Sequence, residues 1–423
     1  MSSTSTTNNG LSGAQSTSLI SSTARSFMLN FLGRLEVGRL VVHEQGKTHE
    51  FGQSGKDAQS HALIKVHDVA AWQAIMLNGS IGAGEAYMAG HWSSPNLTQV
   101  IQVLVANMAL LKTLDKQSSL PAKLLTRLSH FILRRNDIKG SRKNIHAHYD
   151  LSNEFFSLFL DRSMMYSAAI FPNASADIEE AAEHKLWHIC QRLNLKPEDH
   201  LLEIGTGWGA MAIYAARHYG CQVTTTTISQ AQYQHTLKEV KKAGLEDKIT
   251  VLDSDYRELK GKYDKLVSIE MIEAVGHKYY QEYFSQCSAL LKDDGLMLIQ
   301  AITIADQRYE QARRSVDFIQ KYIFPGGALP SVSAIASHIA DDTDMQLVGL
   351  EDITIHYADT LLAWRERFMA RLDDVRNLGF DDTFIRMWEF YLCYCEGGFR
   401  ERVIGTSQVL MAKPQCKALP CVA

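Results

Sequence analysis

Apolar and polar positions alternate from residue 146 onward in a pattern that predicts a parallel sheet covered by helices. Short apolar runs of strand length occupy 200–204, 222–228, 249–253, 264–270, 295–303, 346–351 and 407–412. Segments with helical spacing lie between the first five, at 208–219, 229–243 and 277–291. Helical patterns also occupy 305–323, 331–341, 358–376 and 381–401. The last two exceed what the sheet requires, and we expect them to cap a site.

The N-terminal part of the chain has a different pattern. Residues 1–26 are mostly small and polar, which predicts a disordered tail. Residues 27–118 contain short strand-like runs, such as 40–43 and 62–66, and a helical pattern at 97–115. Between them, 78–92 is expected to be a glycine-rich loop leading into a short helix. We therefore expect a small α+β domain over 27–118, followed by a linker at 119–145 and a larger domain over 146–415.

The linker contains a basic stretch. Residues 121–145 carry seven lysines and arginines against one acid, Asp137, with apolar residues at roughly helical spacing. A basic amphipathic helix of this kind can lie on an anionic membrane surface. The same pattern also suits an exposed interdomain helix whose apolar side packs on the protein. The sequence leaves both interpretations open.

Composition excludes several classes of protein. The chain of 423 residues has an ordinary apolar share of 46% and a net charge of −4, so no strong positive field marks a nucleic-acid binder. Its seven cysteines form no C-x-x-C pair, which argues against structural zinc or a disulfide framework and favours a reducing cytoplasm. We expect no metal site. The sequence contains no run of about 18 apolar residues, so we expect no membrane-spanning helix.

A glycine-rich turn follows the first strand of the larger domain. The stretch 201–209 reads LLEIGTGWG, with Glu203 two residues before glycines 205, 207 and 209. A dinucleotide fold would have G-x-G-x-x-G to hold a pyrophosphate. Here the acid before the glycines suits a cationic ligand instead. The motif resembles the cofactor loop of class I S-adenosylmethionine methyltransferases, and a plain glycine turn is the alternative.

Polar residues follow the other strands of the predicted sheet. In an open α/β sheet, ligands bind at the carboxyl ends of the strands, so these residues should share one rim with the glycine turn. Many class I methyltransferases carry an acid after the second strand, whereas this chain has a run of threonines. We select the following residues of this rim as candidates for the ligand-binding site: Glu203, Thr206, Thr227, Asp255, Tyr256, Glu270, Glu273 and Gln300.

Several stretches together resemble cyclopropane-fatty-acyl-phospholipid synthases and their mycolic-acid-modifying relatives. The resemblance runs from about residue 80 to 412, and its motifs are specific as an ordered set. It implies a Rossmann-like methyltransferase domain with a mostly parallel seven-stranded sheet and helical cap insertions, preceded by a smaller α+β domain. The stretches are 148–156 (HYDLSNEFF), 165–167 (MYS), 202–209 (LEIGTGWG), 227–232 (TISQAQ), 270–276 (EMIEAVG), 321–327 (KYIFPGG) and 395–400 (CEGGFR).

The family resemblance also implies roles for individual residues. Glu273 and Tyr357 would help to hold a bicarbonate ion beside the reacting carbon. Cys395 falls on a cysteine often marked as the active site, although a free cysteine is commonly just a small buried residue. The residues implied in S-adenosylmethionine binding are Tyr166, Ser167, Gly205, Gly207, Thr227, Gln232 and Tyr256.

Two positions depart from the family pattern. Ala168 stands where members often have a cysteine, and Gln300 stands where many bacterial members have a histidine. Glutamine can donate a hydrogen bond but takes up no proton. Bicarbonate therefore stays a possible ligand of an altered pocket. An enzyme with such a pocket could release a methyl-branched or other methylated product instead of a ring.

The sequence predicts an S-adenosylmethionine-dependent methyltransferase that converts the double bond of an unsaturated phospholipid acyl chain into a cyclopropane. We expect a cytoplasmic enzyme, peripherally associated with a membrane, with no nucleic-acid partner and with a homodimer as one candidate assembly. A different methylated lipid or a small-molecule amine is the alternative product. The intact glycine turn and Glu273 argue against a lipid-binding module without activity. The missing G-x-G-x-x-G pattern and the absent acid after the second strand argue against a nicotinamide-dependent oxidoreductase.

Overall fold

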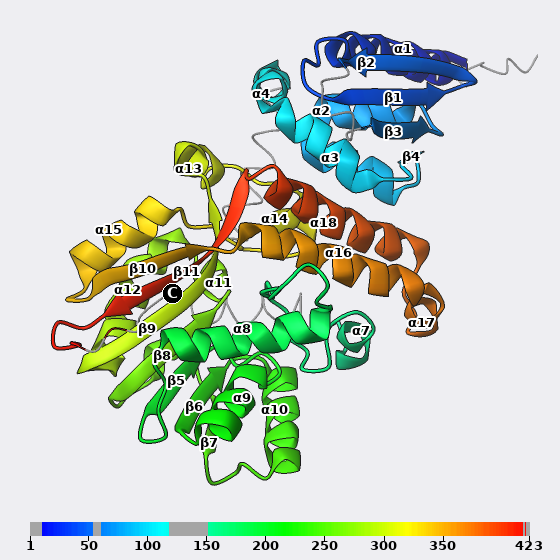
Figure 1. Ribbon diagram of the computed structural model, residues 1–423. Helices are drawn as coiled ribbons and strands as arrows, with labels where there is room; N and C mark the ends of the chain where they lie inside the picture. Colours follow the sequence, from blue (N-terminus) through cyan, green and yellow to red (C-terminus); the bar gives the residue numbers. More distant parts are fainter. Residues whose placement is uncertain (1–10, 54–60, 118–150, 418, 420–423) are drawn as a thin grey trace, which may run out of the picture. The chain divides into compact units, whose positions relative to one another are not determined.

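The computed structural model describes residues 11–53, 61–117, 151–417 and 419, which form two units (Figure 1). One unit comprises the chain up to Thr126 together with Phe380–Gly397, and the other comprises Arg127–Gly379 with the chain from Gly398. The basic stretch 121–145 and the linker 119–145 lie outside the described residues. No helix of the described residues is long and apolar enough to span a membrane.

The second unit is built on a seven-stranded sheet in the order β10-β11-β9-β8-β5-β6-β7. Strands β5 to β9 run parallel, while β11 is antiparallel to both β9 and β10. All seven predicted strands are present, which confirms the predicted fold class. They are β5 (His200–Ile204), β6 (Gln222–Thr227), β7 (Ile249–Asp253), β8 (Tyr263–Ile269), β9 (Leu291–Ile304), β10 (Gln346–Asp352) and β11 (Ile404–Ala412).

Helices cover both faces of this sheet because its strands are apolar on both sides. Adjacent residues Leu201 and Leu202 are fully buried, yet they belong to different apolar clusters, as do Leu266 and Val267. Successive strand side chains point to opposite faces, so each cluster fills one face. One cluster includes side chains of α8 (Ile178–Arg192), α9 (Ala210–Tyr219) and α10 (Gln230–Ala243); the other includes α12 (Tyr280–Leu290) and α15 (Val332–Asp342) (Figure 1).

The second unit contains six further helices among its described residues. They are α7 (Asn153–Ser157), α11 (Ile272–Val275), α13 (Asp306–Ala312), α14 (Phe318–Tyr322), α16 (Thr354–Ala370) and α17 (Leu372–Asn377), with 3₁₀ turns at Tyr256–Glu258 and His277–Tyr279. The helical pattern at 358–376 thus corresponds to two helices. Of these, α16 extends to the strand rim and supplies Tyr357 to the site described below.

The first unit contains a four-stranded sheet in the order β2-β1-β3-β4, with helices packed on it. Its strands are β1 (Arg39–Glu44), β2 (Lys47–Gly52), β3 (His61–Val66) and β4 (Trp92–Ser93). Its helices are α1 (Leu11–Leu32), α2 (Ala70–Met88), α3 (Leu97–Ala106), α4 (Met108–Gln117) and, up to Gly397, α18 (Asp382–Arg400). Tyr87 of α2 and Thr98 of α3 donate hydrogen bonds to the carboxylates of Glu389 and Glu396 of α18, each at 2.7 Å.

Three features of the first unit differ from the sequence predictions. Residues 11–26 are helical rather than part of a tail, because α1 buries an apolar stripe of Ala24, Met28, Phe31 and Leu32 at helical spacing. Residues 380–397 of α18, predicted within the larger domain, group with this unit instead. Most of the glycine-rich stretch 78–92 is helix and not loop.

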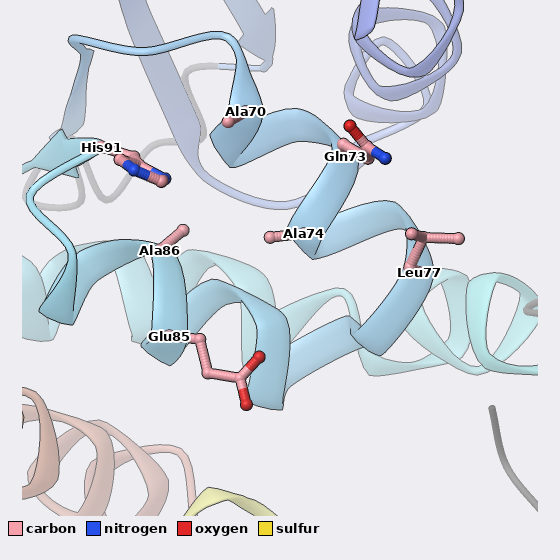
Figure 2. Close-up of a pocket in the computed structure, with 7 residues that line it drawn as sticks. All are labelled: Ala70, Gln73, Ala74, Leu77, Glu85, Ala86 and His91. Carbon is pink, nitrogen blue, oxygen red and sulfur yellow. The ribbon is translucent and has the colours of Figure 1, made fainter. Parts of the chain in front are cut away.

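Helix α2 kinks sharply at Gly79, where φ is 56° and ψ is −130°. Its second half then passes close to the first, since a Cβ at Gly82 would lie only 1.9 Å from the carbonyl oxygen of Ala74. A cavity of about 310 Å³ opens between the two halves, and Figure 2 shows Glu85 and His91 at its edge. None of the residues selected in the sequence analysis is among those that line this cavity.

Candidate active site

The glycine turn after β5 has the backbone geometry that the sequence predicted. Gly205, Gly207 and Gly209 have φ angles of 97°, 54° and 93°, in the region that disfavours other residues. The amides of Gly205 and Thr206 both donate to the carbonyl of Thr226 at 3.0 Å, which fixes the turn against β6. A Cβ added at Gly207 would meet no atom within 4 Å, so this position borders open space. The turn leaves room for a ligand to approach the backbone.

Polar groups beside this turn fit a cationic ligand. Glu203 is 2% exposed and accepts one hydrogen bond, from the Thr225 hydroxyl at 2.5 Å. Burial raises the pKa of Glu203 to about 8, because a buried carboxylate lacks hydration. The Thr206 hydroxyl is also buried, without a hydrogen-bond partner among the described residues. A buried acid and an unpaired hydroxyl next to open space suit the ammonium and polar groups of S-adenosylmethionine.

Glu203 should release a proton when S-adenosylmethionine binds. With a pKa of about 8, the free carboxyl is mostly protonated at pH 7, and a nearby cation stabilises its ionised form. Binding should therefore strengthen as pH rises from 6.5 to about 8.5. Calorimetry in two buffers of different ionisation enthalpy measures the protons released. Glu203→Gln controls for the ligand's own amino group, and equal proton release by both proteins would contradict this assignment.

Four more of the predicted cofactor residues, Thr227, Gln232, Asp255 and Tyr256, lie just at or after the ends of β6 and β7. Thr227 donates to the side-chain oxygen of Gln232 at 2.9 Å, which joins the end of β6 to the first turn of α10. Asp255 accepts two hydrogen bonds from the Arg257 guanidinium, at 2.8 and 2.7 Å. That guanidinium lies 5.3 Å from the ring centre of Tyr256. Asp255 therefore fixes the arrangement around Tyr256, and the cofactor contacts of these residues stay predictions.

Aromatic rings connect the glycine turn with helix α16. Trp208 of the turn lies 5.0 Å from the ring of Phe156, which in turn lies 5.2 Å from Tyr166. Tyr166 lies 5.3 Å from Trp364, and Trp364 makes an edge contact with Tyr357 at 6.2 Å. This cluster provides an apolar wall with electron-rich ring faces, which excludes water and stabilises positive charge.

Glu270, selected above as a rim residue at the end of β8, is the centre of a hydrogen-bond network that the sequence did not predict. Its Oε1 accepts hydrogen bonds from the Ala168 amide and the Gln300 side chain, both at 2.8 Å. Its Oε2 accepts one from the Tyr357 hydroxyl at 2.8 Å. Burial raises the pKa of Glu270, while these three hydrogen bonds and the charge of Lys185 oppose that shift.

Glu273 lies three residues after Glu270, on α11. Its Oε1 accepts from the Ile302 amide at 2.5 Å, and its Oε2 is buried without a partner among the described residues. Burial, and then the neighbouring Glu270, raise the pKa of Glu273 to about 8. The family resemblance implied that Tyr357 and Glu273 hold one ligand together. In the structure the Tyr357 hydroxyl donates a hydrogen bond to Glu270.

A buried lysine completes the charged groups near Glu270. Lys185 of α8 is fully buried and donates to the Ser167 hydroxyl at 2.6 Å. Burial lowers the pKa of Lys185 to about 8, while attraction to Glu270 and Asp161 acts in the opposite direction. Ser167, a predicted cofactor residue, is thus positioned by a cation. Lys185 occurs in an otherwise ordinary amphipathic helix, so no sequence signal distinguished it.

Cys395 lies on α18, in the part of that helix that belongs to the first unit. Its neighbours have structural roles there. Glu396 is buried and accepts the hydrogen bond from Thr98, and a Cβ at Gly397 would come within 2.7 Å of Ile101. Close packing of α18 on α3 is thus a physical reason for the C-E-G-G motif. A catalytic role of Cys395 stays a prediction.

Comparison with known proteins identifies the family. Residues 136–409 match the model of the mycolic acid cyclopropane synthetase family. The chain is 40% identical over 338 residues to the tuberculostearic acid methyltransferase of Mycobacterium tuberculosis, with 78% of each chain covered. It is 34% identical over 357 residues to the cyclopropane-fatty-acyl-phospholipid synthase of Escherichia coli K12, covering 83% of this chain and 88% of that enzyme.

Solved structures agree with this assignment. The crystal structure of the mycolic acid cyclopropane synthase CmaA1 with S-adenosylhomocysteine is 30% identical, with a TM-score of 0.60, and covers 64% of this chain and 98% of that one. The ligand in that structure, S-adenosylhomocysteine, is the demethylated form of S-adenosylmethionine. The site of this chain fits S-adenosylmethionine. The chain belongs to the mycolic acid cyclopropane synthetase family and is an S-adenosylmethionine-dependent methyltransferase.

Proposed function

We propose that this enzyme transfers a methyl group from S-adenosylmethionine to a double-bond carbon of an unsaturated phospholipid acyl chain. The observation that carries this proposal is the pair of buried carboxyl groups, Glu270 and Glu273, beside the aromatic cluster of Tyr166, Trp364 and Tyr357. An alkene that accepts a methyl cation becomes positively charged and then has to lose a proton. The site offers ring faces for that charge and a carboxylate for that proton.

The residues have distinct tasks in this reaction. S-adenosylmethionine, when bound, supplies an electrophilic methyl group on a positively charged sulfur. The glycine turn and Glu203 bind and orient that donor. Trp364, buried beside Tyr166 and Tyr357, excludes water that would otherwise capture the positively charged acyl chain. A carboxylate of the Glu270 and Glu273 pair accepts the proton that the chain loses.

Two products are consistent with this site. Loss of a proton from the transferred methyl group with closure of a third carbon–carbon bond gives the cyclopropane chain that the sequence predicted. The second candidate is a methylated chain without a ring. The relative at 40% identity, named a tuberculostearic acid methyltransferase, supports this alternative, as do Ala168 and Gln300 beside Glu270.

Incubation with a trideuterated methyl donor and vesicles of unsaturated phospholipid distinguishes the products. A cyclopropane keeps two of the three deuterons, and the double bond disappears. A chain that keeps a double bond and carries the label points to methylation without a ring. Mass spectrometry of the released acyl chains measures both properties. Label in an added amine and none in the lipid would overturn the proposal.

We also propose that the enzyme reaches its lipid as a peripheral protein on the cytoplasmic side of a membrane. The amphipathic pattern of 121–145 supports this proposal at the level of sequence, and its structure lies outside the described residues. The homodimer stays a prediction.

A further inference from the structure

Three hydrogen-bond donors converge on one carboxylate of this chain. The Ala168 amide, the Gln300 side chain and the Tyr357 hydroxyl reach Glu270 from three separate segments, each at 2.8 Å. Positions 168, 300 and 357, together with Glu273, are those that the family resemblance connects with a bicarbonate ion. In this chain the donors at positions 168, 300 and 357 are already used by Glu270. A buried donor that served a second anion would have to give up the first.

The surroundings of Glu270 also oppose a separate anion. Glu273 lies nearby, and burial, followed by repulsion from Glu270, raises its pKa to about 8. A further negative charge beside the Glu270 carboxylate would add repulsion in a buried site. Gln300 has no further donor capacity toward an ion, because its amide group donates to Glu270 and to the Ala168 carbonyl and its oxygen accepts from Gln408. The residues present do not fit bicarbonate.

The backbone at Glu270 has an unusual conformation for a residue with a side chain. Glu270 has a φ of 50°, a left-handed conformation that is strained for a residue with a side chain. Its amide is fixed to the Gln300 carbonyl at 2.7 Å. Such strain persists where the surrounding structure holds it, and it is concentrated at functional sites.

We propose that the Glu270 carboxylate replaces bicarbonate as the proton acceptor of this enzyme, so that its reaction needs no bicarbonate. The inference rests on the proposed function. In the step concerned, a C–H bond of the transferred methyl group breaks and the proton goes to Glu270. The C–H electron pair forms the third carbon–carbon bond of a cyclopropane or, after a hydride shift along the chain, a carbon–carbon double bond.

Glu270 is suited to this step because one of its acceptor positions remains. A carboxylate offers about four lone-pair positions. Among the described residues, Oε1 accepts two hydrogen bonds and Oε2 accepts one, from Tyr357. The remaining position on Oε2 is available to a proton. Tyr357 also belongs to the aromatic cluster, so this oxygen lies beside the rings that we assign to the charged acyl chain.

Two substitutions of Glu270 test the proposal. Glu270→Gly removes the carboxylate and leaves a space for a small anion. Glycine also adopts the left-handed backbone conformation at this position without strain. Glu270→Gln keeps the shape of the side chain, fills that space and accepts no proton. In buffer freed of carbon dioxide, lipid methylation by both variants should fall at least tenfold. Added bicarbonate or formate should restore Glu270→Gly in part and leave Glu270→Gln unchanged. Calorimetric binding of S-adenosylhomocysteine shows that both variants are folded.

The wild-type enzyme gives the deciding comparison. We expect equal rates of lipid methylation in bicarbonate-free buffer and in buffer with added bicarbonate. A wild-type rate that requires bicarbonate would overturn the inference and leave the proposed function intact. Activity of Glu270→Gly near the wild-type rate without any added anion would also overturn it. No lipid methylation in either buffer would overturn the proposed function and, with it, this inference.

Discussion

Replacing Gly207 with alanine will lower the affinity for S-adenosylmethionine about a hundredfold, or about 2.7 kcal/mol. Gly207 has a φ of 54°, and a Cβ added there meets no protein atom within 4 Å, so the methyl group points into the space that the ligand needs. Glycine at such a turn allows the backbone to approach a bound cofactor closely. Isothermal titration with S-adenosylmethionine measures the loss directly.

Gly244 provides a matched control for this substitution. It ends helix α10 with a φ of 65°, and a Cβ there also meets nothing within 4 Å. Both alanine variants should lose similar stability, about 1 kcal/mol, because both place a side chain in the left-handed region. Only Gly207→Ala should lose affinity. Equal affinities of the two variants would show that the turn does not hold the cofactor.

Replacing Phe155 with alanine will destabilise the second unit by about 3–5 kcal/mol. Phe155 is fully buried on α7, and its aromatic neighbours include Phe156, Phe159 and Phe368, with ring centres 5.5 to 6.2 Å away. Its removal leaves a cavity among large side chains that are themselves held by packing. Urea unfolding followed by circular dichroism measures the change in the free energy of unfolding.

Trp187 is the appropriate comparison because it is a large aromatic residue with 43% exposure, on helix α8. Its replacement by alanine removes a side chain that remains partly exposed to water, so the expected loss is below about 1 kcal/mol. A loss as large as that of Phe155→Ala would mean that burial does not determine stability in this part of the fold.

The strands of the second unit could be predicted because their sequence pattern and their burial agree. The run from Leu201 to Ile204 is apolar apart from Glu203, and both faces of its strand are covered. The glycines that follow have a conformation that few other residues adopt, so they indicated the turn. Local chemistry was sufficient for this part of the site.

Helices α1 and α2 were harder to predict because tertiary packing outweighs their composition. The serine-rich and glycine-rich sequences of these segments favour loops. In the structure, α1 packs on α2, and Gly82 allows one half of α2 to cross the other. The buried stripe from Ala24 to Leu32 was the available signal, but only four positions carry it.

The network around Glu270 depends on contacts that no local pattern contains. Its donors come from residues 168, 300 and 357, which are separated by more than fifty positions from one another. The sequence placed Glu270 and Gln300 on one rim, but it gave no reason to join Tyr357 to Glu270 rather than Glu273. That choice depends on the register between β8 and β9 and on the start of α16.

Methyl transfer from S-adenosylmethionine to an acyl double bond is tested most directly with two kinds of vesicle and a labelled methyl donor. One kind contains unsaturated phospholipid and the other contains the matching saturated phospholipid. We expect label in the acyl chains of the unsaturated lipid, one S-adenosylhomocysteine for each methylated chain, and no label in the saturated lipid. Equal labelling of both lipids, or S-adenosylhomocysteine formed without labelled acyl chains, would contradict it.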